Sequence, residues 1–208
     1  MRLPSVLVAL ASLAIRAQAQ DASVAAAVNK FNAAGIPAAL GIPFNPTYVL
    51  SAHYTYSGFA VYFASGAHHT GSTLWPHPEF QFHYTTEDTD PGPYVVVIVD
   101  LDVDGGTRYY LASGYAFNWR SGWLEHAFDG TPAGAPINYI TDWKTPPPNV
   151  GEPREHRLVY LAFKQSPGFD GQTLVTPETP TGNWSLSAFV NATQLGEPVA
   201  GVFCWLKN

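Results

Sequence analysis

Residues 94–106 read YVVVIVDLDVDGG, an unbroken apolar run followed by acids at every second position and then two glycines. Apolar residues at consecutive rather than alternate positions are typical of a strand that is buried on both faces. We therefore expect a strand over residues 94–101 in the middle of a packed structure, and a two-sheet sandwich accommodates such a strand best.

Working outward, Pro and Gly separate further short runs of β-branched and aromatic residues. These runs predict strands over residues 48–56, 59–63, 80–84, 109–116, 157–163 and 199–206. Apolar spacing of three and four predicts a helix over 21–34, stopped by Gly35, and a second within 183–196. The predicted fold is all-β dominated: a two-sheet antiparallel β-sandwich with a few short peripheral helices.

The N-terminus has the pattern of a secretory signal peptide. Arg2 precedes a short apolar run, and Ala17-Gln18-Ala19 is a small-residue cleavage pattern. The run is too short to span a membrane. We expect cleavage after Ala19, which leaves 189 of the 208 residues, 20–208, as a single secreted, extracellular domain. Loss of Arg2 and Arg16 changes the formal net charge from −6 to −8.

This charge excludes several classes of partner. With 8 basic and 16 acidic residues, the mature chain lacks the positive footprint of a nucleic-acid-binding protein. It also lacks a polybasic run for anionic membranes and, after the signal, any transmembrane segment. Its single cysteine, Cys204, lies in an apolar run and is predicted to be a small buried residue without chemistry.

The acids after the apolar strand are the first candidate site. Alternation along an extended chain places Asp100 and Asp102 on one face, about 6.5–7 Å apart. Close carboxylates raise at least one pKa, so that a neutral acid can donate a hydrogen bond to an anion. A calcium loop fits poorly, because Leu111 stands where a bidentate glutamate is needed. A solvated acidic corner is the other interpretation.

The second candidate is the proline-rich loop that leads into His156 and Arg157. Three consecutive prolines, residues 146–148, form a rigid extended wall. A histidine beside it titrates near neutral pH, although a lone histidine is more often an ordinary hydrogen-bonded residue. Four of the other histidines, His68, His69, His77 and His83, show no metal-ligand spacing and are expected at the surface.

Together these stretches resemble the phosphatidylethanolamine-binding protein family. The resemblance rests on Val99-Asp100-Leu101-Asp102, on Pro147-Pro148 followed by His156-Arg157-Leu158-Val159-Tyr160-Leu161, and on Pro198-Val199-Ala200-Gly201. The three motifs occur in the family's order across residues 40–206.

The resemblance implies a β-sandwich with a small surface pocket for phosphate or a phospholipid headgroup. Carried over residue by residue, the ligand-binding residues are Asp100, Asp102, Pro147, Pro148 and His156, and Tyr109 stands where relatives have a second pocket histidine. The sequence contains no recognisable metal-ligand set, no Gly-x-Ser-x-Gly elbow and no P-loop, so we expect a non-catalytic binding protein without a cofactor. Some members of the family act on protein partners, including inhibition of a serine carboxypeptidase.

Two further expectations stand beside this one. The sequons at Asn183 and Asn191 predict glycosylation of a secreted chain. The alternative function is a secreted carbohydrate-active or carbohydrate-binding sandwich, suggested by six Trp, eleven Tyr and several acids. Glycosidases need paired carboxylates across a cleft. This alternative calls for an open groove lined by Trp119, Trp123 or Trp143, near acids such as Asp100, Asp102, Glu125 and Glu155.

Overall fold

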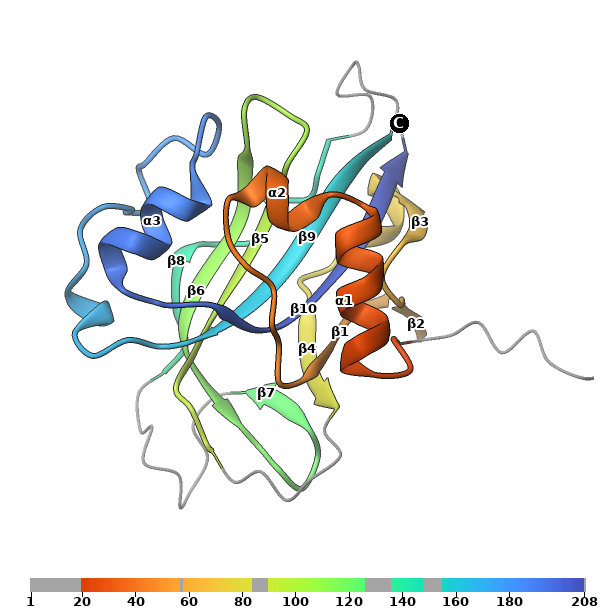
Figure 1. Ribbon diagram of the computed structural model, residues 1–208, viewed down its shortest axis with the longest axis horizontal. Coiled ribbons are helices and arrows are strands. Elements are labelled where there is room, and N and C mark those ends of the chain that lie inside the picture. The colour runs from red at the N-terminus through yellow and green to blue at the C-terminus, as the bar shows by residue number, and fades with distance from the viewer. Residues whose placement is uncertain (1–19, 57, 84–89, 126–135, 148–154, 208) are drawn as a thin grey trace, which may run out of the picture.

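The structure is a computed structural model that describes residues 20–56, 58–83, 90–125, 136–147 and 155–207 (Figure 1). The predicted signal peptide, residues 1–19, lies outside the described residues, as does Pro148. In chain order the elements are α1 (Val24–Ala33), α2 (Ile36–Leu40), β1 (Val49–Tyr56), β2 (Phe59–Tyr62), β3 (Ala67–Thr70), η1 (Gly71–Leu74), β4 (Glu79–His83), β5 (Tyr94–Asp100), β6 (Thr107–Phe117), β7 (Trp123–Glu125), β8 (Asn138–Thr141), β9 (Glu155–Lys164), η2 (Phe169–Gly171), α3 (Leu186–Thr193) and β10 (Pro198–Lys207).

The described strands form one hydrogen-bonded, curled sheet. Their order is β2-β1-β4-β7-β6-β5-β9-β10-β3, and β8 pairs with β6. The all-β dominated prediction is confirmed, but two separate sheets are not clearly present. Uniform antiparallel pairing is wrong at one edge, because β3 runs parallel to β10. No hairpin joins these two strands, which are distant in sequence, so chain connectivity does not impose an antiparallel direction.

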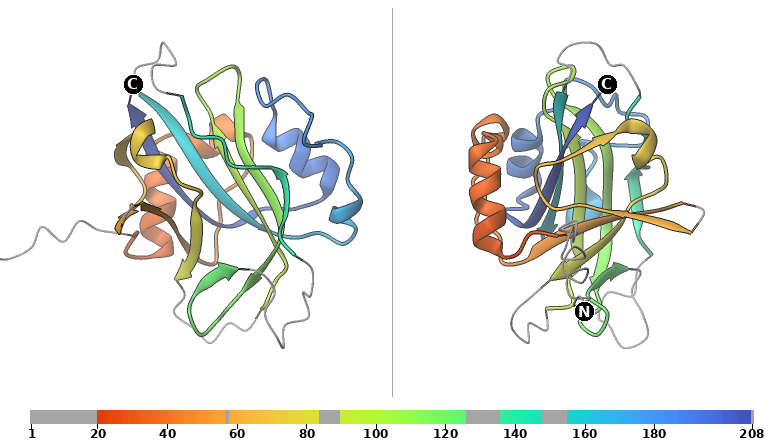
Figure 2. Two further views of the ribbon diagram at one scale, coloured as in Figure 1. Left: turned by 180° about the vertical axis from the view of Figure 1, so that it is seen from behind. Right: turned by 90° about the vertical axis from the view of Figure 1, so that its right-hand side faces the viewer.

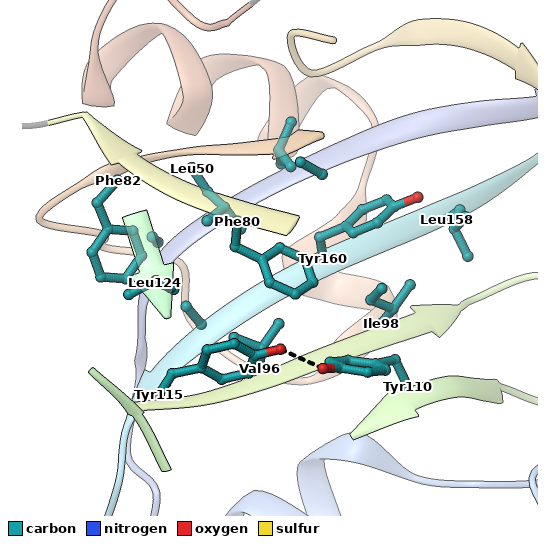
Figure 3. Packing of buried hydrophobic residues seen from close by; sticks show 14 of the residues in the cluster. Leu50, Phe80, Phe82, Val96, Ile98, Tyr110, Tyr115, Leu124, Leu158 and Tyr160 are labelled. Carbon is teal, nitrogen blue, oxygen red and sulfur yellow. Dashed lines mark hydrogen bonds between the residues drawn. The ribbon is translucent and has the colours of Figure 1, made fainter. Parts of the chain in front are cut away.

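Curling of the sheet creates two hydrophobic cores, one on each face. The inner core lies between β1 and β4 on one side and β5, β6, β9 and β10 on the other. Figure 3 shows Phe80 of β4 facing Tyr160 and Val96 across this core. The helix-side core lies between the opposite face of the sheet and α1, α2 and α3, which cover that face (Figures 1 and 2).

Strand β5 lies between the two cores. All seven of its residues are buried. Val96 and Ile98 belong to the inner core, whereas Val95, Val97 and Val99 belong to the helix-side core. The prediction of a strand that is buried on both faces is therefore confirmed, and the unbroken apolar run has this packing as its physical cause.

A β-bulge in β6 determines where one candidate residue points. Ile98 pairs with Tyr110 and Val99 pairs with Arg108, so Tyr109 is the extra residue on β6. A bulge changes the direction of the side chains beside it. As a result Tyr109 and Tyr110, although adjacent in sequence, both pack in the inner core.

The remaining elements match the sequence unevenly. All seven predicted strands and both predicted helices are present, with ends that differ by a few residues. Three short strands, β3, β7 and β8, and the five-residue α2 have no clear sequence signal because they lack a long apolar period. Cys204 is buried, as expected. Within the described ranges, no helix has the length and apolar character to cross a membrane.

Candidate functional site

A buried acid–histidine pair joins the ends of two neighbouring strands. Asp100 ends β5, and His156 lies near the start of β9, which pairs with β5. Their side chains are fully buried, and His156 Nδ1 is hydrogen-bonded to Asp100 Oδ2. Asp100 Oδ1 accepts the backbone N–H of Asp102 at 3.1 Å. Both carboxylate oxygens are thus engaged, which orients the imidazole ring.

Asp102 lies on the other face of the sheet. Its Oδ2 accepts the backbone N–H and Nε–H of Arg157, both at 2.8 Å, and its Oδ1 pairs with Nη2 of the same side chain. Arg157 also donates to the carbonyl oxygen of Ala34 at the end of α1. His156 and Arg157 are consecutive strand residues, so they point to opposite faces.

The expectation that Asp100 and Asp102 share one face is therefore wrong. The physical reason is local, because β5 ends at Asp100 and the chain bends over residues 101–103. Strand alternation no longer applies beyond that point. The expected rise in pKa also fails for Asp102: burial raises its pKa, but the hydrogen bonds and charge of Arg157 outweigh burial and lower it.

This ion pair gives a testable pH dependence. Because the pKa of Asp102 is lower in the folded chain than the ordinary value of 3.8, its stabilising contribution is complete above that value. The contribution is lost as pH falls through the lowered folded pKa. We expect Asp102→Asn to reduce the free energy of unfolding by about 1–2 kcal/mol at pH 7. Urea unfolding should show this difference shrinking towards pH 2, and a constant difference would contradict the assignment.

Tyr109 lies on the same face as the Asp100–His156 pair. Its side chain is almost completely buried in the inner core. Burial, followed by the negative charges of Asp100 and Asp104, raises its pKa to about 12. Tyr109 therefore keeps its proton at neutral pH. It can donate a hydrogen bond, as the histidine implied by the resemblance would.

Two buried ring nitrogens complete the group. Trp143 Nε1 and His69 Nε2 are buried, and neither has a hydrogen-bond partner among the described residues. The Trp143 ring lies 6.5 Å from that of Tyr109. His69 is opposite Leu206 on β10, and Leu206 is opposite His156 on β9. His69 therefore lies two strands away, about 10 Å across the sheet.

We call Asp100, His156, Tyr109, His69 and Trp143 the inner cluster. Phe63 and Tyr54 lie between two of its members, His69 and Trp143: the ring distances are 4.9 Å from Phe63 to His69 and 5.8 Å from Tyr54 to Trp143. Sequence reasoning named Trp143 only for the carbohydrate alternative and expected His69 at the surface. His69 is partly buried, with Nε2 fully covered, because β3 pairs with β10, and no local pattern signals that pairing.

The proline loop is placed by a close backbone approach. A Cβ atom on Gly71 would lie 2.7 Å from the carbonyl oxygen of Pro146, so only glycine fits where η1 meets the loop. This contact holds residue 146 beside the segment that follows His69. Pro146 is buried and Pro147 is exposed. Pro148 falls in the undescribed part of the loop.

Of the comparisons with known proteins, the comparison with solved structures is informative about the fold. No protein-family model matches the sequence, and no curated protein matches it either. Among solved structures, the chain is similar to a phosphatidylethanolamine-binding protein, pfl0955c, from Plasmodium falciparum. The two share 12% identity with a TM-score of 0.56, over 86% of this chain and 96% of that one.

The solution structure of CG7054 is also similar. It shares 16% identity with a TM-score of 0.50, over 84% of this chain and 91% of the other. These identities are too low to carry a function, but the coverage extends over nearly the whole of both solved chains. The chain therefore has the fold of the phosphatidylethanolamine-binding proteins.

Proposed function

We propose that this protein is a secreted, non-catalytic binding protein whose inner cluster holds a small phosphate-bearing group, either free phosphate or a phospholipid headgroup. The observation that carries the proposal is the buried Nε1–H of Trp143, which has no acceptor among the described residues. The phosphatidylethanolamine-binding fold of the Plasmodium protein supports the ligand class.

The energetic argument starts from this indole. An indole N–H is a donor only, and a buried donor without an acceptor costs about 1–3 kcal/mol. A phosphate oxygen offers the missing acceptor. Tyr109 is a second neutral donor on the same face, because its pKa of about 12 keeps the phenol protonated. Neutral donors can bind an anion in an acidic protein without requiring a positive surface.

The Asp100–His156 pair adapts this site to an anion. A carboxylate close to phosphate would repel it, but here Asp100 is engaged by His156 and by the backbone N–H of Asp102. When His156 carries its second proton, the positive charge of the ring balances the carboxylate of Asp100, so the pair does not repel an anion. Asp102 is not part of this ligand set because Arg157 holds it on the opposite face.

Calorimetric titration at pH 6 with phosphate and with phosphoethanolamine tests the proposal. We expect millimolar binding by the wild type. Trp143→Phe keeps an aromatic ring but removes the N–H, and it should weaken binding about 5- to 10-fold, corresponding to one lost hydrogen bond. His156→Ala should abolish binding. Equal affinities for the two ligands would indicate phosphate recognition, whereas tighter phosphoethanolamine binding would indicate the headgroup.

Trp119→Phe is the matched control, because Trp119 is half exposed and stacks under Arg120 outside the inner cluster. It should leave the affinity unchanged. Absence of wild-type binding at millimolar ligand, or unaltered binding by Trp143→Phe, would overturn the proposal.

Secretion and glycosylation belong to the same proposal. Asn183 and Asn191 are both exposed, which is compatible with glycan attachment. Mass spectrometry of the secreted chain should find an N-terminus at Gln20 and a glycan on at least one of these residues. An intact Met1 would contradict cleavage of the signal peptide, and two unmodified asparagines would contradict glycosylation.

A further inference from the structure

A cavity lies near the start of β5, whereas Asp100 of the inner cluster lies at the end of that strand. Its volume is about 260 Å³. The side chains that line it include Glu79, Glu125, Trp123, Tyr139 and His77. Tyr115 also lines it and pairs with Tyr94 at the start of β5, whereas Asp100 ends that strand. The strand from Tyr94 to Asp100 is about 20 Å long. None of the inner-cluster residues is among the described residues that line the cavity.

Two carboxylates, those of Glu79 and Glu125, line this cavity. Phe80 pairs with Leu124 and Gln81 with Trp123. We extend this register by one residue, to the ends of both strands, and infer that Glu79 lies opposite Glu125. Glu79 precedes the inward-facing Phe80 in β4, and Glu125 follows the inward-facing Leu124 in β7. Because side chains alternate along a strand, both glutamates lie on the outer face of the sheet. Side chains directly opposite across antiparallel strands have Cβ atoms about 4.5–5.5 Å apart, and like charges there are destabilising.

No lysine or arginine among the described lining residues compensates this charge, and the histidine of that lining, His77, lies 3.7 Å from a carboxylate oxygen of Asp142. Glu125 accepts a hydrogen bond from the neutral amide of Asn118. On the other side of Glu79 the register places His53, whose pKa is lowered to about 4 by burial and by His83. His53 is therefore uncharged at neutral pH.

Aromatic rings stand beside the two acids. Trp123 is partly buried, and Tyr139 is 41% exposed. The faces of such rings attract cations within about 6 Å, and the attraction strengthens when water is excluded. Acids alone would fit a hydrated metal ion, but paired acids with large aromatic surfaces favour an organic ammonium group. The cavity volume is below the roughly 300 Å³ at which drug-sized sites begin, so the ligand is small.

We propose that this cavity binds a small organic cation, with its ammonium group between Glu79 and Glu125 and its methyl or methylene groups against Trp123 and Tyr139. This site is separate from the inner cluster, and it does not depend on the function proposed above.

Choline is the probe, and 3,3-dimethyl-1-butanol, which has the same shape without the charge, is its matched neutral control. Calorimetry and thermal unfolding at pH 7 and low salt should show that choline binds and raises the Tm. The neutral alcohol should bind at least 10-fold more weakly. Glu79→Gln and Glu125→Gln should each weaken choline binding at least 5-fold, whereas Glu178→Gln, an exposed acid elsewhere, should not.

A second readout separates ligand binding from a structural role. Without choline, Glu79→Gln should raise the Tm by about 1–3 °C, because it removes one of two opposed charges. The same variant should lose the further rise that choline causes in the wild type.

Equal binding of the neutral alcohol, or choline binding that both glutamine variants retain, would overturn the proposal. So would binding of methyl β-glucoside but not of choline, since that result would assign the cavity to a neutral sugar. Asp100→Asn should leave choline binding unchanged, which keeps this result distinguishable from failure at the inner cluster.

Discussion

Replacing Asp100 by alanine is expected to lower the free energy of unfolding by about 3–5 kcal/mol, because removing one member of a buried pair leaves its partner buried without compensation. The Asp100 and His156 side chains are fully buried and hydrogen-bonded to each other. The substitution also removes the acceptor for the backbone N–H of Asp102. Urea unfolding at pH 7 measures the loss.

Comparison with a double variant checks the cause. In Asp100→Ala combined with His156→Leu, the ring that needs the carboxylate is gone, so the double variant should be more stable than the sum of the single effects implies. Strictly additive losses would show that the two side chains are not coupled. A loss below 1 kcal/mol for Asp100→Ala would show that the pair is not buried.

Gly106→Ala is expected to reduce stability by about 2–4 kcal/mol. Gly106 has a φ of +109°, a backbone conformation that favours glycine. A Cβ atom there would also lie 2.6 Å from the carbonyl oxygen of Trp184, and this backbone atom cannot rotate away. Strain of about 1 kcal/mol and overpacking of about 1–3 kcal/mol act together. The measurement is again urea unfolding.

Gly168→Ala separates the two contributions. Gly168 also has a positive φ, +79°, but no atom lies within 4 Å of the Cβ that alanine would add. It should lose only the cost of backbone strain, about 1 kcal/mol. Equal losses at the two glycines would refute the contact with Trp184 as the cause. The test matters for the site, because Gly106 ends the turn that bends the chain away from Asp100.

Much of the fold could be predicted from short-range patterns. The unbroken apolar run of β5 indicated a strand with two buried faces, since each consecutive residue needs an apolar environment. The spacing of Ala27 and Phe31 indicated α1, which buries both side chains against the sheet. Strands β3, β7 and β8 could not be predicted, because three or four residues carry too little periodicity and depend on their partner strands.

The candidate site, like the fold, could be predicted only in part from the sequence. Asp100 and His156 stood out because each borders a strongly apolar strand, and the structure brings them into contact. Asp102 was misplaced because alternation was extended past the end of β5. His69 was expected at the surface, but it is partly buried and its Nε2 is covered. The strand pairing that covers it joins residues more than 130 positions apart.

The amino-acid sequence alone was enough to identify the buried central strand, the two candidate residues Asp100 and His156, and the resemblance to a family of known fold. These depend on hydrophobic periodicity and on residue types, which are local properties of the chain. Only the tertiary structure decided that Asp102 pairs with Arg157 rather than with His156, that Trp143 and His69 have buried ring nitrogens, and that Glu79 and Glu125 line one cavity. Each of these depends on strand register and on where a strand ends. Such features arise from packing between distant segments, so no local pattern encodes them.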